Sequence, residues 1–126
     1  MDRSLAGGEI LSRLRRICLS FPESSETDSW GHPNFRAGRK IFAVLEEYRG
    51  ELTIGFKCTL LEQEALLEDP RFFASPYVGD RGWVSLRVGS GRLPWKRIAA
   101  WLAGSYRLVA LKRMLTALDS REQRSR

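Results

Sequence analysis

Residues 34–57 have the sequence NFRAGRKIFAVLEEYRGELTIGFK, which predicts three strands joined by two tight turns. In residues 52–57 apolar and less apolar side chains alternate, the two-residue period of a half-buried strand. Gly38 and Gly50 provide the backbone freedom that tight turns need. We therefore expect an antiparallel sheet with one face packed inward and the other facing solvent.

Helices are predicted on both sides of this block of strands. Apolar residues at helical spacing indicate them, and proline, glycine and serine mark their ends. This order of helices and strands predicts the α+β class, here a twisted antiparallel sheet with helices packed on one face. The expected elements are helices over residues 5–19 and 60–68, a core-anchoring loop at Phe72 and Phe73, an irregular loop over 75–81, a strand over 83–88, and a helical region from Pro94 that Gly104 and Ser105 kink or break.

The chain has 126 residues and 43% apolar residues, enough for one domain with a real core. We expect a single domain over residues 1–119 and a frayed basic tail over residues 120–126. No apolar stretch is long enough to cross a membrane, and no signal sequence is visible, so the expected location is the cytoplasm. A monomer is favoured.

Positive charge is concentrated near the end of the chain. Residues 1–91 hold 12 Lys and Arg against 13 Asp and Glu, whereas residues 92–126 hold nine against two, so the net charges are −1 and +7. A one-sided basic region is how a protein meets a polyanion such as nucleic acid, although a solvated helix face has the same composition.

Neither a catalytic site nor a metal site is predicted. Cys18, Cys58 and the single histidine, His32, form no zinc-binding pattern, and no cofactor is expected. A serine nucleophile at Ser105 would need a base oriented by a third group, and only the distant His32 is available. We instead expect Ser105 to cap the last helix and Tyr106 to pack with its hydroxyl paired.

Four segments of the chain carry a recognisable pattern: WGHPNFR (30–36) followed by GRKIFA (38–43), LTIGFK (52–57), PYVG (76–79) with GWV (82–84), and SYRLVA (105–110) closed by Lys112 and Arg113. Their order and spacing resemble the MmcQ/YjbR family over roughly residues 10–118. This chain has Leu111 where the family pattern often has proline, so we expect the last helix to continue unbroken. The resemblance implies a frataxin-like (CyaY-like) α+β sandwich and a protein commonly labelled DNA-binding.

Two functions remain open. The first is non-enzymatic nucleic-acid binding with weak sequence preference, and double-stranded DNA is the expected ligand. Phosphates would be held by a basic hairpin and a basic C-terminal helix, since Lys and Arg replace phosphate counterions. The candidate residues for this interface are Arg36, Arg39, Lys40, Lys57, Arg87, Lys96, Arg97, Arg107, Lys112 and Arg113.

The second function is that of a small-ligand or protein-interaction module with an aromatic pocket near His32. Aromatic side chains on an exposed sheet can stack on flat ligands, although they fill cores at least as often. The candidate pocket residues are Trp30, His32, Phe35 and Trp83.

Overall fold

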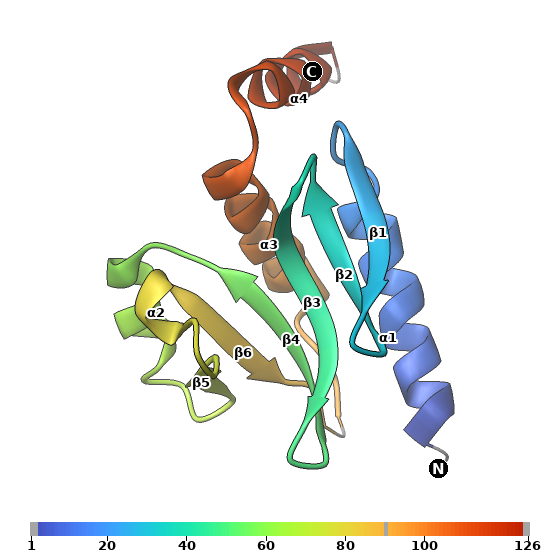
Figure 1. Ribbon diagram of the computed structural model, residues 1–126, viewed down its shortest axis with the longest axis vertical. Helices are drawn as coiled ribbons and strands as arrows, with labels where there is room; N and C mark the ends of the chain where they lie inside the picture. The colour runs from blue at the N-terminus through green and yellow to red at the C-terminus, as the bar shows by residue number, and fades with distance from the viewer. Residues whose placement is uncertain (1–2, 90, 125–126) are drawn as a thin grey trace.

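The computed structural model describes residues 3–89 and 91–124 of the chain. In chain order the elements are α1 (Arg3–Cys18), β1 (Ser24–Ser29), β2 (His32–Ala37), β3 (Lys40–Tyr48), β4 (Glu51–Lys57), α2 (Leu60–Leu66), β5 (Phe72–Ala74), the 3-10 helix η1 (Gly79–Arg81), β6 (Trp83–Arg87), α3 (Trp95–Val109) and α4 (Lys112–Arg124). The strands form one antiparallel sheet in the order β1-β2-β3-β4-β6-β5 (Figure 1). The expected α+β fold is confirmed.

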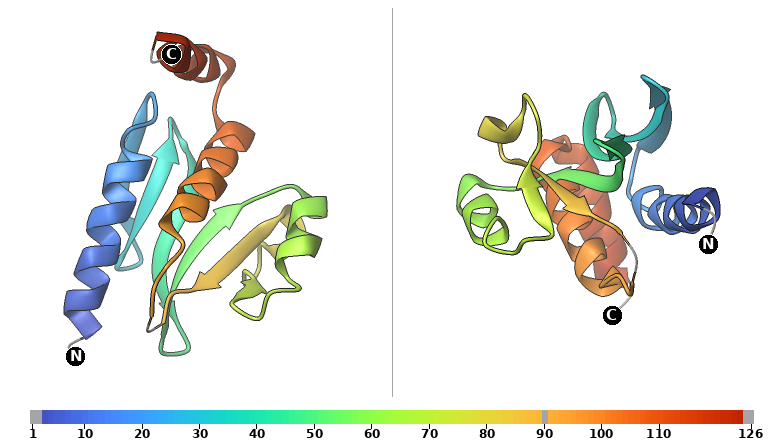
Figure 2. Two further views of the ribbon diagram at one scale, coloured as in Figure 1. Left: turned by 180° about the vertical axis from the view of Figure 1, so that it is seen from behind. Right: turned by 90° about the horizontal axis from the view of Figure 1, so that it is seen from below.

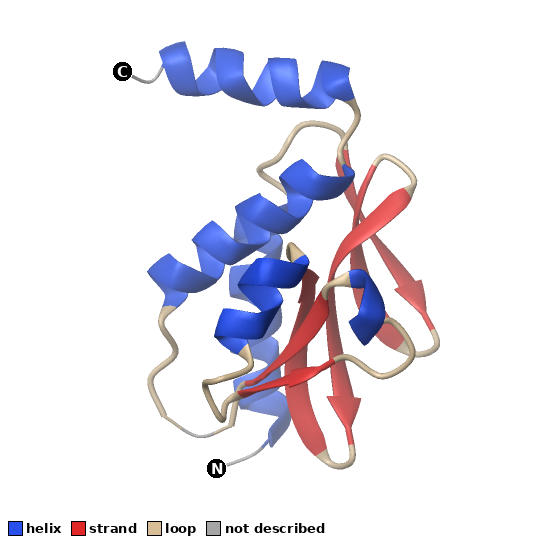
Figure 3. Ribbon diagram, turned by 90° about the vertical axis from the view of Figure 1, so that its left-hand side faces the viewer, coloured by secondary structure: helices blue, strands red, loops and turns tan. Residues whose placement is uncertain are grey.

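Helices α1 and α3 cover one face of the sheet (Figure 2). Figure 3 shows η1 on the other side of the sheet and α4 across one end of it. We call the face opposite α1 and α3 the open face. The largest fully buried apolar side chains of the core are Leu14, Phe35, Phe42, Ile54, Phe56, Val84, Leu86, Ile98, Leu102, Tyr106 and Met114. Among the described residues, none of the helices has the length and apolar character to cross a membrane.

The sequence pattern predicts neither of the two edge strands. β1 has the sequence SSETDS, which lacks apolar alternation, and is held by its ladder with β2 from Ser24 opposite Ala37 to Ser29 opposite His32. β2 accordingly begins at His32, two residues before the expected start. β5 has three residues, and the predicted loop anchor at Phe72 is instead a strand paired with β6. Edge strands satisfy one side of the ladder only and tolerate polar sequences, so alternation does not reveal them.

Both predicted tight turns are present. Gly38, between β2 and β3, has a φ of +61°, and Gly50, between β3 and β4, has a φ of +81°. Both values lie in the left-handed region that glycine enters without steric cost. A residue is skipped in the ladder between β2 and β3, where Phe35 pairs with Ala43 and Arg36 with Ile41.

Ser105 joins α3 to the sheet and does not cap a helix, because α3 continues to Val109. Its Oγ donates to the carbonyl of Phe42 at 2.6 Å and accepts the N–H of Lys57 at 2.9 Å. Phe42 and Lys57 face each other one residue beyond the last β3–β4 pair, Ala43 with Phe56, so the serine bridges a carbonyl and an N–H where this ladder ends. The expectation for Ser105 is therefore wrong.

Tyr106 follows Ser105 and is fully buried. Its hydroxyl donates to the carbonyl of Pro22 at 2.7 Å, which confirms the expected pairing. The ring stacks on Phe21 with centroids 4.7 Å apart and meets Phe42 edge-on at 5.5 Å. This aromatic group ties α3 to the turn that precedes β1.

The C-terminal helical region breaks later than expected. Gly104 and Ser105 lie inside α3, and the break falls at Ala110, whose backbone is extended with a ψ of 150°. Leu111 therefore does not let the helix run on, because the extended residue before it has already redirected the chain. α4 then continues to Arg124, so the tail predicted to fray from residue 120 is helical up to that residue; residues 125–126 lie outside the described part.

Candidate nucleic-acid interface and the pocket beside it

The β2–β3 turn and α4 lie against each other. Gly38 faces Met114, since a Cβ built on the glycine would come within 2.8 Å of the methionine methyl carbon. The N–H of Gly38 donates to the carbonyl of Glu23 at 3.0 Å. The carboxylate of Glu23 accepts two hydrogen bonds from Arg113, at 2.9 and 2.8 Å. These hydrogen bonds also lower the pKa of Glu23. Three segments distant in sequence thus meet at one end of the molecule.

Most of the predicted phosphate-binding residues gather at this end. Besides Arg124 at the last described position of α4, seven cations and three carboxylates lie there, and the seven exceed the carboxylates by four positive charges. The seven cations, which we call the basic end, are Arg36, Arg39, Lys40, Arg107, Lys112, Arg113 and Arg121. The three carboxylates are those of Glu23, Asp119 and Glu122.

Several basic-end cations already have partners. Arg107 contacts Asp119 at 3.0 Å and Glu122 at 3.4 Å. Arg36 donates to the Thr27 hydroxyl at 3.0 Å and to the Arg39 carbonyl at 2.6 Å. These contacts shape the surface more than they serve a ligand.

The exposed cations of the basic end are its most available groups. Arg39, Lys40 and Lys112 are exposed, and within the described ranges none of them forms an ion pair with a carboxylate. Arg121 was placed in the expected frayed tail and was not a sequence candidate, yet it donates to the Ser20 carbonyl at 2.9 Å. The helical spacing of Met114 and Leu118, both buried, is the signal that the helix continues as far as Arg121.

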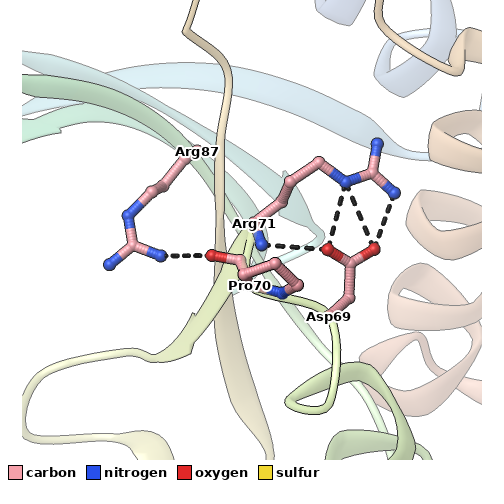
Figure 4. Close-up of polar contacts among 4 residues, drawn as sticks. All are labelled: Asp69, Pro70, Arg71 and Arg87. Atoms are coloured by element: carbon pink, nitrogen blue, oxygen red, sulfur yellow. Dashed lines mark hydrogen bonds and ion pairs between the residues drawn. The ribbon is translucent and has the colours of Figure 1, made fainter.

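The remaining candidate cations lie elsewhere. Arg87, at the end of β6, donates to Glu51 at 2.9 Å and to the Pro70 carbonyl at 2.8 Å. Figure 4 shows it next to the pair formed by Arg71 and Asp69, whose hydrogen bonds hold the pKa of Asp69 at about 2. Arg87 therefore braces the turn before β5 and is a poor phosphate ligand.

Three further candidates are separated from the basic end. Lys96 and Arg97 lie in the first turn of α3, and Arg97 stacks over Trp101 at 5.0 Å. A helix of this length places them about 20 Å from α4. Lys57 ends β4 opposite Trp83, on the open face.

The open face contains a pocket of about 410 Å³. Such a volume falls within the range of roughly 300–1,000 Å³ that is usual for small-ligand sites. Val44 and Gly55 form its floor, where β3 and β4 pair. The aromatic residues around it are Tyr48, Tyr77 and Trp83, and Ile41 and Glu46 also line it.

His32 lies beside this pocket. Its Nε2 is 3.3 Å from Oε2 of Glu46, on the neighbouring strand. Asn34 follows on the same side of β2, opposite the pocket residue Val44. The buried Nδ1 of His32 and Nδ2 of Asn34 have no hydrogen-bond partner in the part of the chain that the structure describes. A polar strip thus borders the aromatic pocket.

The four predicted pocket residues have different fates. Trp83 lines the pocket, and His32 reaches it through Glu46. Trp30 is fully exposed at the β1–β2 turn and does not line the pocket. Phe35 is fully buried in the core with the helices, so its assignment to the pocket is wrong. Along a strand successive side chains point to opposite faces, and Phe35 falls on the helix side while Asn34 falls on the open side.

Most pocket residues were not sequence candidates for this site, among them Glu46, Tyr48 and Tyr77. The first two share the open side of β3 with Val44, so period-two spacing could have found them. Tyr77 could not be found in this way, because it lies in the irregular loop after β5. It is fully exposed and has a φ of +69°, an unusual backbone conformation for a tyrosine.

The loop that carries Tyr77 is fixed by buried contacts. Gln63 of α2 donates to the carbonyls of Gly79 at 2.6 Å and Trp83 at 3.1 Å. Ser75 and Ser85 share a hydrogen bond of 2.9 Å. The pocket wall is therefore held in place before any ligand arrives.

Gly82, next to the pocket residue Trp83, is tightly packed against the backbone of Cys58. Gly82→Ala should destabilise the protein by about 3 kcal/mol. Its φ is +91°, and a Cβ would come within 2.2 Å of the carbonyl oxygen of Cys58. Urea denaturation followed by circular dichroism measures the change. The matched control is Gly104→Ala, in open space within α3, which should stabilise by up to about 1 kcal/mol. Equal effects of the two substitutions would contradict the prediction.

Other chemistry has little support in the described residues. No group of three or more His, Cys, Asp or Glu side chains there could hold a metal ion. Burial raises the pKa of Cys58 to about 11 and also raises that of Cys18, so both thiols are protonated at neutral pH.

The fold and these surfaces define a small α+β protein with one helix-covered sheet face, one open face with a pocket, and a basic end. A family model, YjbR, matches residues 19–108, and the chain belongs to the YjbR family. No curated protein gives a match.

Solved structures share the fold. The Deinococcus radiodurans protein DR2400, described with a DUF419 domain, matches with a TM-score of 0.69 and 21% identity, over 86% of this chain and 87% of that one. A Pseudomonas syringae protein matches with a TM-score of 0.65 and 15% identity, over 86% of this chain and 98% of that one.

Proposed function

We propose that this protein is a non-catalytic nucleic-acid-binding module that holds the phosphates of duplex DNA with its basic end. The observation that carries the proposal is the contact of the β2–β3 turn with α4 through Gly38 and Met114. It brings Arg39 and Lys40 to the same end of the molecule as Lys112, with no carboxylate paired to any of the three in the described residues. Lysine and arginine in such a cluster replace phosphate counterions.

Binding of this kind positions DNA without reading its sequence. Phosphate contacts are the same for every base pair, whereas sequence readout requires side chains that reach base edges in a groove. α4 contributes mainly charge and presents Lys112, Thr116 and Arg124 as exposed polar groups. We therefore expect a weak sequence preference on duplex DNA.

The salt dependence of binding tests the proposal. With about four phosphate contacts, the logarithm of the affinity should fall with a slope of about −3.6 against the logarithm of salt concentration. Raising salt from about 50 to about 200 mM should then weaken binding by about 100-fold. Fluorescence anisotropy with a labelled blunt duplex measures this. Absence of binding at low salt and micromolar protein, or binding that ignores salt, would rule the proposal out.

A further inference from the structure

The pocket on the open face is continuous with the basic end. Ile41, which lines the pocket, directly follows Lys40 of the β2–β3 turn. The same strand then passes under the pocket through Val44 and Glu46. A polymer bound to the turn by its backbone can therefore place a side group on this face.

The pocket suits a flat ring. Because residue 55 is a glycine, the floor has no side chain at this point. A Cβ built there would meet Val44 and the Val84 carbonyl at the ordinary contact distances of 3.8–3.9 Å. Tyr48, Tyr77 and Trp83 supply aromatic faces around that floor. Aromatic side chains on a sheet are typical stacking platforms for nucleobases.

Charge around the pocket selects among flat ligands. Among the described residues Glu46 is the one carboxylate of the pocket lining. Its Oε2 lies against His32, and its other carboxylate oxygen is a further acceptor. Lys57 lies opposite Trp83 in the ladder, and Arg36 lies opposite Ile41. Cations at these two positions disfavour an organic cation and favour a neutral ring attached to a negatively charged backbone.

We propose that this pocket takes one unpaired nucleobase of a bound nucleic-acid strand. The base stacks on the aromatic side chains and donates an exocyclic amino hydrogen to Glu46, while Lys57 meets a flanking phosphate. This inference rests on the proposed nucleic-acid binding and adds single-stranded segments to its ligands. No covalent step is involved.

The acceptor at Glu46 predicts a preference among bases. Cytosine and adenine carry an amino group that can donate to a carboxylate. Thymine carries a single N–H between two carbonyl oxygens, and these repel a carboxylate. Single strands of cytosine or adenine should therefore bind about tenfold more tightly than single strands of thymine.

The test compares labelled single strands of about ten nucleotides, made of deoxycytidine, deoxyadenosine or thymidine, with a blunt duplex. The full chain is used at low salt with anisotropy detection. Glu46→Gln should remove most of the preference for cytosine over thymine, because an amide both donates and accepts. Tyr77→Ala should weaken single-strand binding about fivefold or more and leave duplex binding unchanged.

Tyr77 is fully exposed, so its removal should not prevent folding. The matched control is Trp30→Ala, which removes another fully exposed aromatic residue with a positive φ, of +58°, that does not line the pocket. It should leave single-strand affinity unchanged. A loss with Trp30→Ala equal to that with Tyr77→Ala would overturn the assignment of the pocket.

The outcomes separate the two proposals. Duplex binding with no base preference on single strands, unaffected by Glu46→Gln, would overturn the pocket inference and leave the proposed function standing. Absence of binding to every nucleic acid would overturn both. Deoxycytidine monophosphate that binds as tightly as the deoxycytidine strand would show a free-nucleotide site and overturn the strand as the ligand.

Discussion

Replacing Lys40 and Lys112 together by glutamate is expected to lower the affinity for duplex DNA by more than about 100-fold near 50 mM salt. Each phosphate contact is worth about a factor of ten at that salt concentration, and each reversed charge adds repulsion. Both lysines are exposed and form no ion pair with a carboxylate in the described residues, so stability should change little. Arg113 is left in place because it is bonded to Glu23.

The control is a second charge reversal with the same change in net charge. Arg92→Glu with Lys96→Glu alters two exposed cations at the opposite end of α3 from α4 (Figure 2). These positions lie about 20 Å from the basic end, beyond the Debye length of about 10 Å at moderate salt. The control pair should lower affinity by only a few-fold at about 0.1 M salt. Equal losses in the two double variants would contradict a localised interface.

Tyr106→Ala is expected to destabilise the protein by about 4 kcal/mol, the largest loss of stability that we predict for a single substitution. The side chain is fully buried, and its ring packs against Phe21 and Phe42. Removing it leaves a cavity and an unpaired Pro22 carbonyl. Domains of this size have about 5–15 kcal/mol of stability, so the variant should be much less stable or unfolded at room temperature.

Tyr106→Phe keeps the ring and isolates the hydroxyl. We expect a loss of about 1–2 kcal/mol, because the buried Pro22 carbonyl loses its donor. Urea unfolding followed by circular dichroism compares both variants with the wild type. A phenylalanine variant as unstable as the alanine variant would show that packing is not the main contribution of this residue.

The central strands could be predicted from the sequence because their stability comes from one apolar face. Ile54 and Phe56 are buried at the alternate positions that the pattern of residues 52–57 indicates. β1 could not be predicted, since its polar residues are held by backbone pairing with β2 alone. The end of α3 depends on the backbone of Ala110, and no residue type at that point signals a break.

The sequence indicates which residue types form the candidate site. It does not indicate which of these side chains are free to contact a ligand. The sequence places cations at Lys40 and Lys112, but only folding brings the turn against α4. It cannot show that Arg87 is engaged by Glu51 and the Pro70 carbonyl, because that contact joins segments 17 or more residues apart. In the pocket, an error of one position in strand parity moves a residue such as Phe35 from the core to the surface.

The connection between α3 and α4 is two residues long, and α4 lies beyond residues 19–108, which the family model matches. Its buried residues Met114 and Leu118 belong to the hydrophobic core. Three of the seven basic-end cations, Lys112, Arg113 and Arg121, are carried by this helix. Substitutions on the exposed side of this helix therefore alter the charge of the basic end while Met114 and Leu118 stay in place, so surface charge and the ability to fold can evolve separately.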